Sequence, residues 1–290
     1  MPRIPVVFSM LLLNSVLCIP SVQAAWFPQQ DVLTVAHQKL LEGSSAESFD
    51  AMIQAWQGKP TEEQEANLNA LLNLAVTEDC GRSLDATRFP AWLKSLTVQR
   101  EMIQNQSQVL PKLAITGTSS KQIKHIDFIR WPQEKVLSAS PGRLSGDYFS
   151  IETKRLEKAS SAGLYQLIIN TGDGEEFKEW VILSPPKRKQ WINWVDSRTW
   201  RIEKNGLPDK ACPTPILSMN IYDLNDTSWT PLWTENVDGR LPTSLPEVDL
   251  PDGRYWLSVG IIESRWQGEL SVLDIQSITR PVDHTGDSFK

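Results

Sequence analysis

Histidine and cysteine are few in this sequence, with three of each, and the spacing of its reactive side chains matches no catalytic or metal-binding set. The three histidines, His37, His125 and His284, include no pair four residues apart, which is the helical spacing of zinc-binding histidines. The chain contains no Gly-x-Ser-x-Gly elbow, no phosphate-binding loop and no dinucleotide fingerprint. We therefore expect no metal and no cofactor, and we assign no catalytic residue.

Acidic residues could still form the paired carboxylates of a hydrolase. The candidates are Glu175, Glu176 and Glu179, which follow the hairpin signal Gly172-Asp173-Gly174. Acidic residues beside a turn are normally solvated, so we interpret these three as surface residues. The stretch Asp223–Asp226 is rich in oxygen ligands, but it lacks the glycine and the distal glutamate of a calcium-binding loop, and we interpret it as a turn.

The N-terminus predicts export from the cytoplasm. Arg3, an apolar stretch from Val6 to Val16 and the small-residue pattern Val22-Gln23-Ala24 form a cleavable signal peptide. We predict a signal peptide over residues 1–24 with cleavage after Ala24. The product is expected to be periplasmic or exported, with no membrane insertion after cleavage.

Removal of that segment leaves two cysteines, Cys80 and Cys212. Two cysteines in an oxidising compartment usually pair, so we expect a disulfide between them. Two buried free thiols are the alternative.

Bulk composition narrows the class of protein and of partner. Hydrophobic residues make up 40% and charged residues 22% of the chain, which is ordinary globular composition. The formal net charge of −6 argues against nucleic acid or an anionic membrane surface as the partner.

Tryptophan is abundant, with twelve in the chain, and aromatic rings can bind ligands. The candidates for binding are Trp191, Trp194 and Trp200, which cluster, and Trp256. Trp256 belongs to the stretch Leu250–Ile262, whose alternation predicts a strand with Tyr255, Leu257 and Val259 on one face and Trp256 on the other. These tryptophans could pack the core or an interface, bind a protein, or stack on sugar rings.

Helical periodicity dominates the first third of the mature chain, so we predict a helical domain over residues 25–110. Helices are expected from Asp31, from Ser44 and from the capping box Thr61-Glu-Glu-Gln64. A fourth helix is predicted from Pro90 to about Asn105, because proline suits the first helical turn and apolar residues recur after it.

Short alternating segments separated by turns follow, which predicts an α+β multidomain chain. After a helical bundle of about four helices we expect two Ig-like β-sandwich modules, over residues 111–204 and 205–280, and a flexible tail over residues 281–290. The same Gly-x-Tyr-x-Leu pattern occurs at Gly163 and at Gly253, which is typical of a repeated module.

Several of these features together resemble a known family. The signal ending Val22-Gln-Ala24, the helical first third, the lone Cys80 and Cys212 and the stretch Leu250-Pro-Asp-Gly-Arg-Tyr-Trp-Leu257 resemble an uncharacterised family of secreted periplasmic proteins from vibrio-type gammaproteobacteria. The resemblance implies a periplasmic protein tied to cell-envelope sensing or homeostasis, and it transfers no site residues.

The leading expectation for function is a non-enzymatic periplasmic protein that binds another envelope protein, such as the sensor domain of a signalling system. The alternative is a carbohydrate or peptidoglycan-binding module that uses exposed tryptophans. An enzyme with an unrecognised site, such as a glycan hydrolase, is the third possibility.

Overall fold

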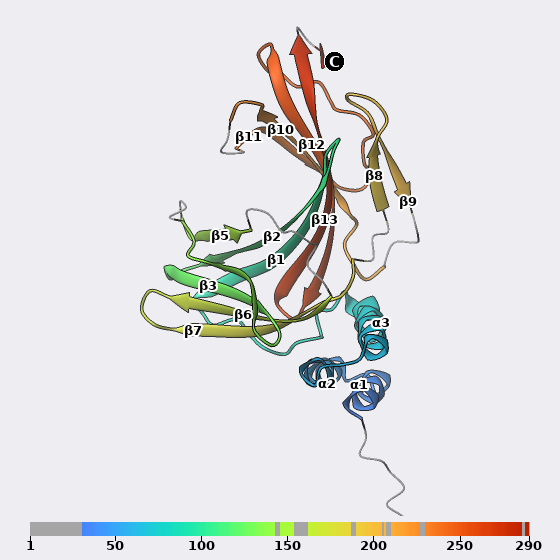
Figure 1. Cartoon of the computed structure of the whole chain (residues 1–290), viewed down its shortest axis with the longest axis vertical. Coiled ribbons are helices and arrows are strands. Elements are labelled where there is room, and N and C mark those ends of the chain that lie inside the picture. The colour runs from blue at the N-terminus through green and yellow to red at the C-terminus, as the bar shows by residue number, and fades with distance from the viewer. Residues whose placement is uncertain are drawn as a thin grey trace, which may run out of the picture. The chain divides into compact units, whose positions relative to one another are not determined.

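The computed structural model describes residues 31–142, 146–153, 162–186, 190–204, 206, 210–226, 230–285 and 288–289 (Figure 1). The predicted signal peptide over residues 1–24 and its cleavage site after Ala24 lie outside the described residues.

Three helices open the described chain, as the apolar spacing predicted: α1 (Val32–Leu41), α2 (Ser45–Gln57) and α3 (Glu62–Asp79). The capping box at the start of α3 is confirmed. The Gln64 N–H donates to Thr61 Oγ1 (3.4 Å) and the Thr61 N–H donates to Gln64 Oε1 (2.9 Å).

The rest of the described chain is β structure, in one large sheet, one four-stranded sheet and one hairpin. The large sheet has the order β11-β10-β12-β13-β1-β2-β5, with β14 (Ser288–Phe289) added to β13. Its strands are β1 (Leu93–Gln104), β2 (Val109–Ser119), β5 (Tyr148–Glu152), β10 (Ile216–Asp223), β11 (Pro231–Val237), β12 (Gly253–Gln267) and β13 (Leu270–Thr285). The four-stranded sheet has the order β4-β3-β6-β7, with β3 (Ile123–Arg130), β4 (Glu134–Ala139), β6 (Gly163–Thr171) and β7 (Glu176–Leu183). The hairpin consists of β8 (Gln190–Trp194) and β9 (Trp200–Lys204).

The helix predicted from Pro90 to about Asn105 is wrong, because this segment forms strand β1. Leu96, Val98 and Arg100 are buried while the residues between them are partly exposed, which is a two-residue period. β1 is paired on both sides, antiparallel with β2 and parallel with β13. Those partners come from distant parts of the chain, and their pairing overrides the local helical spacing.

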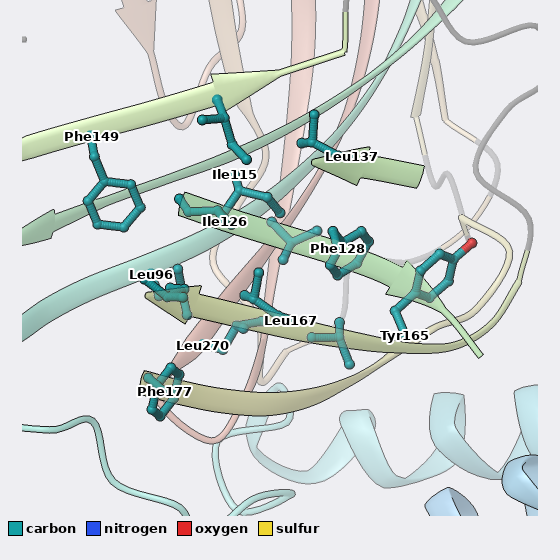
Figure 2. Close-up of a cluster of buried hydrophobic side chains, with 14 of the residues drawn as sticks. Leu96, Ile115, Ile126, Phe128, Leu137, Phe149, Tyr165, Leu167, Phe177 and Leu270 are labelled. Carbon is teal, nitrogen blue, oxygen red and sulfur yellow. The ribbon is translucent and has the colours of Figure 1, made fainter. Parts of the chain in front are cut away.

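Two hydrophobic cores lie on the same face of the large sheet. The first core lies between β1, β2, β5 and the four-stranded sheet, and Figure 2 shows its side chains. The second core lies between β10, β12, β13 and the hairpin β8–β9. β13 contributes Leu270 and Val272 to the first core and Ile278 and Val282 to the second, and even spacing along a strand means one shared face.

The two predicted sandwich modules are therefore not separate. Strands on both sides of the expected junction at residue 205 belong to one sheet, and the hairpin before that junction packs in the second core. β13 is 16 residues long, far above the ordinary strand length of about 5–6 residues, and this one strand contributes to both cores. The coarse expectation of helices followed by β structure is confirmed.

The predicted flexible tail is also wrong for Pro281–Thr285, which complete β13. Val282 and His284 are only 2% and 3% exposed. The His284 ring meets the Tyr255 ring edge-on at 6.4 Å, so a histidine expected in a frayed end is a core residue.

Charged side chains separate the two cores on the core face of the large sheet. Arg100 forms a two-pronged ion pair with Asp274 (Nε–Oδ1 2.7 Å, Nη2–Oδ2 2.8 Å) and donates from Nη1 to the Ser184 carbonyl (2.7 Å). Arg265 donates to the Ile182 carbonyl (3.2 Å). Burial lowers the pKa of the Arg265 guanidinium to about 10, against the opposing effect of the Asp274 charge. These guanidinium groups attach the end of β7 and Ser184, which follows it, to the large sheet.

Two buried glutamines strengthen that attachment. The Gln267 side chain donates to the Ile182 carbonyl (2.5 Å) and accepts from the Ile182 N–H (3.2 Å). Gln276 does the same for Ile192, at 3.3 and 3.2 Å. Each glutamine amide hydrogen-bonds with the N–H and the carbonyl of one residue, as a neighbouring strand would. The four-stranded sheet and the hairpin are therefore both bonded to the large sheet.

Candidate functional site

The predicted disulfide is confirmed: Cys80 and Cys212 are bonded, with their Cα atoms 4.9 Å apart. Cys80 ends α3 in a left-handed conformation (φ 62°), and its carbonyl accepts from the Trp266 N–H (2.8 Å). The next carbonyl, of Gly81, accepts from the Gly268 N–H (3.1 Å), so this turn lies along the end of β12. A structural disulfide indicates an extracytoplasmic protein, since cytosolic thiols are normally kept reduced.

The face of the large sheet opposite the two cores, which we call the open face, is the candidate site. Figure 1 shows the sheet curled, with the four-stranded sheet and the hairpin β8–β9 on its outer side and the open face on its inner side. By alternation from the core residues, the open face includes Thr97, Gln99 and Glu101 of β1, Thr116 of β2, Ser218, Asn220 and Tyr222 of β10, Thr234 of β11, Trp256 and Ser258 of β12, and Ser277 and Thr279 of β13.

Small hydroxyl residues of the open face are buried although they belong to neither core. Ser258, Ser277 and Thr279 are less than 10% exposed. Gly260 contributes to this close packing, because a Cβ atom at that position would lie 2.7 Å from Ser277 Oγ. The inner side of the curl therefore combines low exposure with many hydroxyl groups.

Aromatic rings stand beside these hydroxyls. Trp256 is half-buried, and its neighbours across the strands are Tyr222 on β10 and Pro281 on β13. Tyr255 and Leu257, on either side of it in sequence, are buried in the second core. The prediction that Trp256 turns away from the Tyr255 face is confirmed.

Hydrogen bonds order the polar part of the open face. Thr234 donates to Asn220 Oδ1 (2.9 Å), and Asn220 donates from Nδ2 to Ser218 Oγ (3.1 Å). Ser277 donates to Glu101 Oε1 (2.6 Å).

The hydroxyl of Tyr222 lies within reach of a carboxylate charge. Burial raises the pKa of the Tyr222 hydroxyl, and the negative charge of Glu101 raises it further. The phenol is therefore a neutral donor at physiological pH, in the electrostatic field of one carboxylate.

The four tryptophans considered as possible binding residues do not form one site. Trp200 is 2% exposed and donates from Nε1 to the Pro242 carbonyl (2.9 Å), so it is a core residue. Trp194 packs edge-on against it at 6.0 Å, and Trp191 on the same hairpin is 37% exposed. Of the four, Trp256 is the one on the open face. Tyr222 and Glu101 were missed, because β1 was predicted as helix and β10 offered no distinctive motif.

Glu179 corrects the interpretation of the acidic residues after Gly174. Glu175 and Glu176 are exposed as expected, but Glu179 is 9% exposed and hydrogen-bonds with Asp85. Burial raises the pKa of Glu179 to about 9, and the hydrogen bond and charge of Asp85 add to the shift. In glycosidases the two catalytic carboxyls are about 5 Å or more apart, and the substrate lies between them. Glu179 and Asp85 are in direct contact, so no substrate fits between these two carboxyls.

Glutamine at position 179 is expected to remove a pH dependence of stability. Because Glu179 stays protonated in the folded state up to pH about 9 and ionises near 4.5 when unfolded, folding takes up a proton in this interval. The free energy of unfolding of the natural protein should then fall as pH rises, by up to about 1.4 kcal/mol per pH unit. Glu179→Gln keeps the donor to Asp85 and should flatten this part of the profile.

Urea unfolding at pH 5, 7 and 9 measures this effect. Glu176→Gln, an exposed position on the same strand, should leave the profile unchanged. Parallel profiles for the natural protein and Glu179→Gln would contradict the buried-acid explanation.

A sequence profile described as "Protein of unknown function (DUF2861)" matches residues 26–283. The chain belongs to this family. A search of the curated proteins found no match. Among solved structures, the chain is similar to "Biofilm associated protein - BSP domain", with 11% sequence identity and a TM-score of 0.24. That alignment covers 65% of this chain and 29% of the other, and a likeness so distant supports no statement about function.

Other candidate sites in this DUF2861 protein are less developed. A cavity of about 370 Å³ lies between the β2–β3 turn and the residues before β5. Its charged residues are already paired, Lys121 with Asp173 (2.7 Å) and Asp147 with Lys94 (2.5 Å).

Within the described ranges, no group of three or more His, Cys, Asp or Glu residues could hold a metal ion. No helix in the described part of the chain has the length and apolar character to cross a membrane.

Proposed function

We propose that this protein is a non-enzymatic binding protein of the periplasm, and that it binds a glycan on the open face. The observation that carries the proposal is the neighbouring pair Trp256 and Tyr222, which lies outside both cores among hydroxyl and amide side chains. A sugar ring has apolar C–H faces and a rim of hydroxyls. An aromatic surface beside neutral hydrogen-bonding groups is complementary to both.

The position of the site supports a long ligand. The open face extends over the seven strands of the sheet, and among the described residues none of its side chains belongs to the first core or to the core of the helices. Tyr148 of β5, 47% exposed, belongs to the same face at the far edge of the sheet. A glycan strand could therefore contact aromatic rings at two separated points. Peptidoglycan and exported polysaccharides are the strands of this kind in the proposed compartment.

Alanine at position 256 is expected to weaken glycan binding about tenfold, since a stacked aromatic ring contributes about 1 kcal/mol or more. Binding of soluble peptidoglycan fragments by the mature protein can be followed by isothermal titration calorimetry. Because Trp256 is half-buried and belongs to neither core, Trp256→Ala should remain folded, which the melting temperature checks.

Trp191→Ala is the matched control, since Trp191 is an exposed tryptophan on the hairpin, away from the open face. It should bind as the natural protein does. Equal binding by Trp256→Ala and the natural protein, or a large fall in melting temperature with unchanged binding, would mean that Trp256 serves packing instead.

An envelope protein is the second candidate ligand, favoured by the edge strand β11. Within the described residues β11 pairs only with β10, most of its residues are exposed, and Leu232 is 55% exposed. An unpaired strand edge can accept an extended segment of a partner. If the immobilised natural protein retains one specific envelope protein and binds no peptidoglycan fragment, the protein-binding function is favoured. If the retained protein is the sensor domain of a signalling system, that domain is the partner.

A further inference from the structure

Among the described residues, the open face carries one carboxylate without a cationic partner, that of Glu101. Glu101 is half-buried, and its interactions within the described residues are the hydrogen bond from Ser277 (2.6 Å) and its charge effect on Tyr222. Lys112 is opposite Glu101 on β2, but its ammonium is bound to Glu152 (2.7 Å). A partly desolvated carboxylate with a single hydroxyl donor is costly and is stabilised strongly by an added cation.

The surroundings of Glu101 fit a cation that is part of an organic ligand. Tyr222 and Trp256, neighbours across the strands, are on the same face as Glu101, and the register places Trp256 opposite Pro281, four positions along β13 from Ser277. Aromatic faces attract ammonium groups, most strongly where water is partly excluded. The remaining groups nearby, Ser277 and Asn220, are neutral and suit the hydroxyls of the same ligand.

We propose that the open face binds its ligand through an ammonium group placed against Glu101, and that the glycan it takes carries free amino sugars rather than fully N-acetylated ones. This inference rests on the proposed glycan-binding function and narrows its ligand class. An N-acetyl group removes the positive charge and adds bulk where Glu101 needs a cation, so acetylation should weaken binding. The net charge of −6 of the whole chain also favours the approach of a cationic strand.

Two oligosaccharides that differ only in acetylation test this directly: a glucosamine hexamer and the N-acetylglucosamine hexamer. The natural protein should bind the glucosamine hexamer about tenfold more tightly, as a charge-assisted hydrogen bond implies. In Glu101→Gln that preference should disappear, because the affinity for the glucosamine hexamer should fall to that for the acetylated hexamer. Raising the salt concentration should weaken the first interaction and not the second.

Glu203→Gln is the matched control, because it removes the same charge from an exposed position on β9, outside the open face. It should keep the natural preference, and the melting temperature of each variant confirms folding. A trilysine peptide provides a non-sugar ammonium: if it binds through Glu101 while the glucosamine hexamer does not bind, the amino-sugar ligand is overturned in favour of a basic peptide.

The remaining outcomes separate this inference from the proposed function. The natural protein could bind both hexamers equally, or the acetylated one more tightly, while Trp256→Ala loses this binding. That result would overturn the ammonium site and leave glycan binding intact. Absence of binding by either hexamer, by peptidoglycan fragments and by trilysine would overturn both.

Discussion

Alanine in place of Asp274 is expected to lower the free energy of unfolding by about 3–5 kcal/mol, because it leaves two buried guanidinium groups without their carboxylate. Asp274 holds Arg100 by two short hydrogen bonds, and the side chains of this pair are 7% and 14% exposed. The charge of Asp274 also supports Arg265, which burial already disfavours as a cation. Urea unfolding monitored by tryptophan fluorescence measures the loss.

Asp283→Ala is the matched control, since Asp283 lies on the same strand and pairs with Arg254. That pair has side chains 58% and 65% exposed, and such surface pairs contribute about 1 kcal/mol or less. A similar small loss for Asp274→Ala would show that the Arg100–Asp274 pair contributes no more than a surface ion pair. It would also show that the glutamine contacts alone hold β7 and β8 on the large sheet.

Removing the Cys80–Cys212 bond is expected to cost about 2–5 kcal/mol of stability, because the bond closes a loop of 132 residues in the unfolded chain. The mature chain with both cysteines replaced by serine should unfold at lower urea concentration than the oxidised natural protein. Reduced natural protein should match the double-serine variant.

Thiol titration of the mature chain in denaturant without reductant should detect no free thiol. Two free thiols would contradict the bond. Equal stability of the oxidised and reduced forms would mean that the backbone hydrogen bonds of the turn at Cys80 already hold α3 against β12.

Much of the local structure could be predicted because it depends on neighbours in sequence. The capping box at Thr61 satisfies backbone groups three residues away, so its pattern is sufficient to place the start of α3. Alternation around Trp256 was sufficient to decide which residues face a core and which do not, since a strand turns successive side chains to opposite faces. Neither inference needed knowledge of the partner strand.

The candidate site was predicted only in part. Trp256 could be proposed from its strand, but its companions Tyr222 and Glu101 come from β10 and β1, which are brought near it by the strand order β10-β12-β13-β1. Glu179 shows the same limit for burial, because a residue after a turn looks solvated until the distant residue Asp85 is placed against it.

By itself, the sequence determined the three helices, the pairing of the two cysteines and the two unlike faces of the strand at Trp256. Only the tertiary structure decided that the segment after Pro90 is a strand, that one sheet supports both cores, and that Glu101, Tyr222 and Trp256 share the open face. The physical reason is that hydrogen-bond caps and side-chain alternation act over a few residues. Strand pairing joins residues more than 170 positions apart, as Arg100 and Asp274 show, and depends on the whole chain.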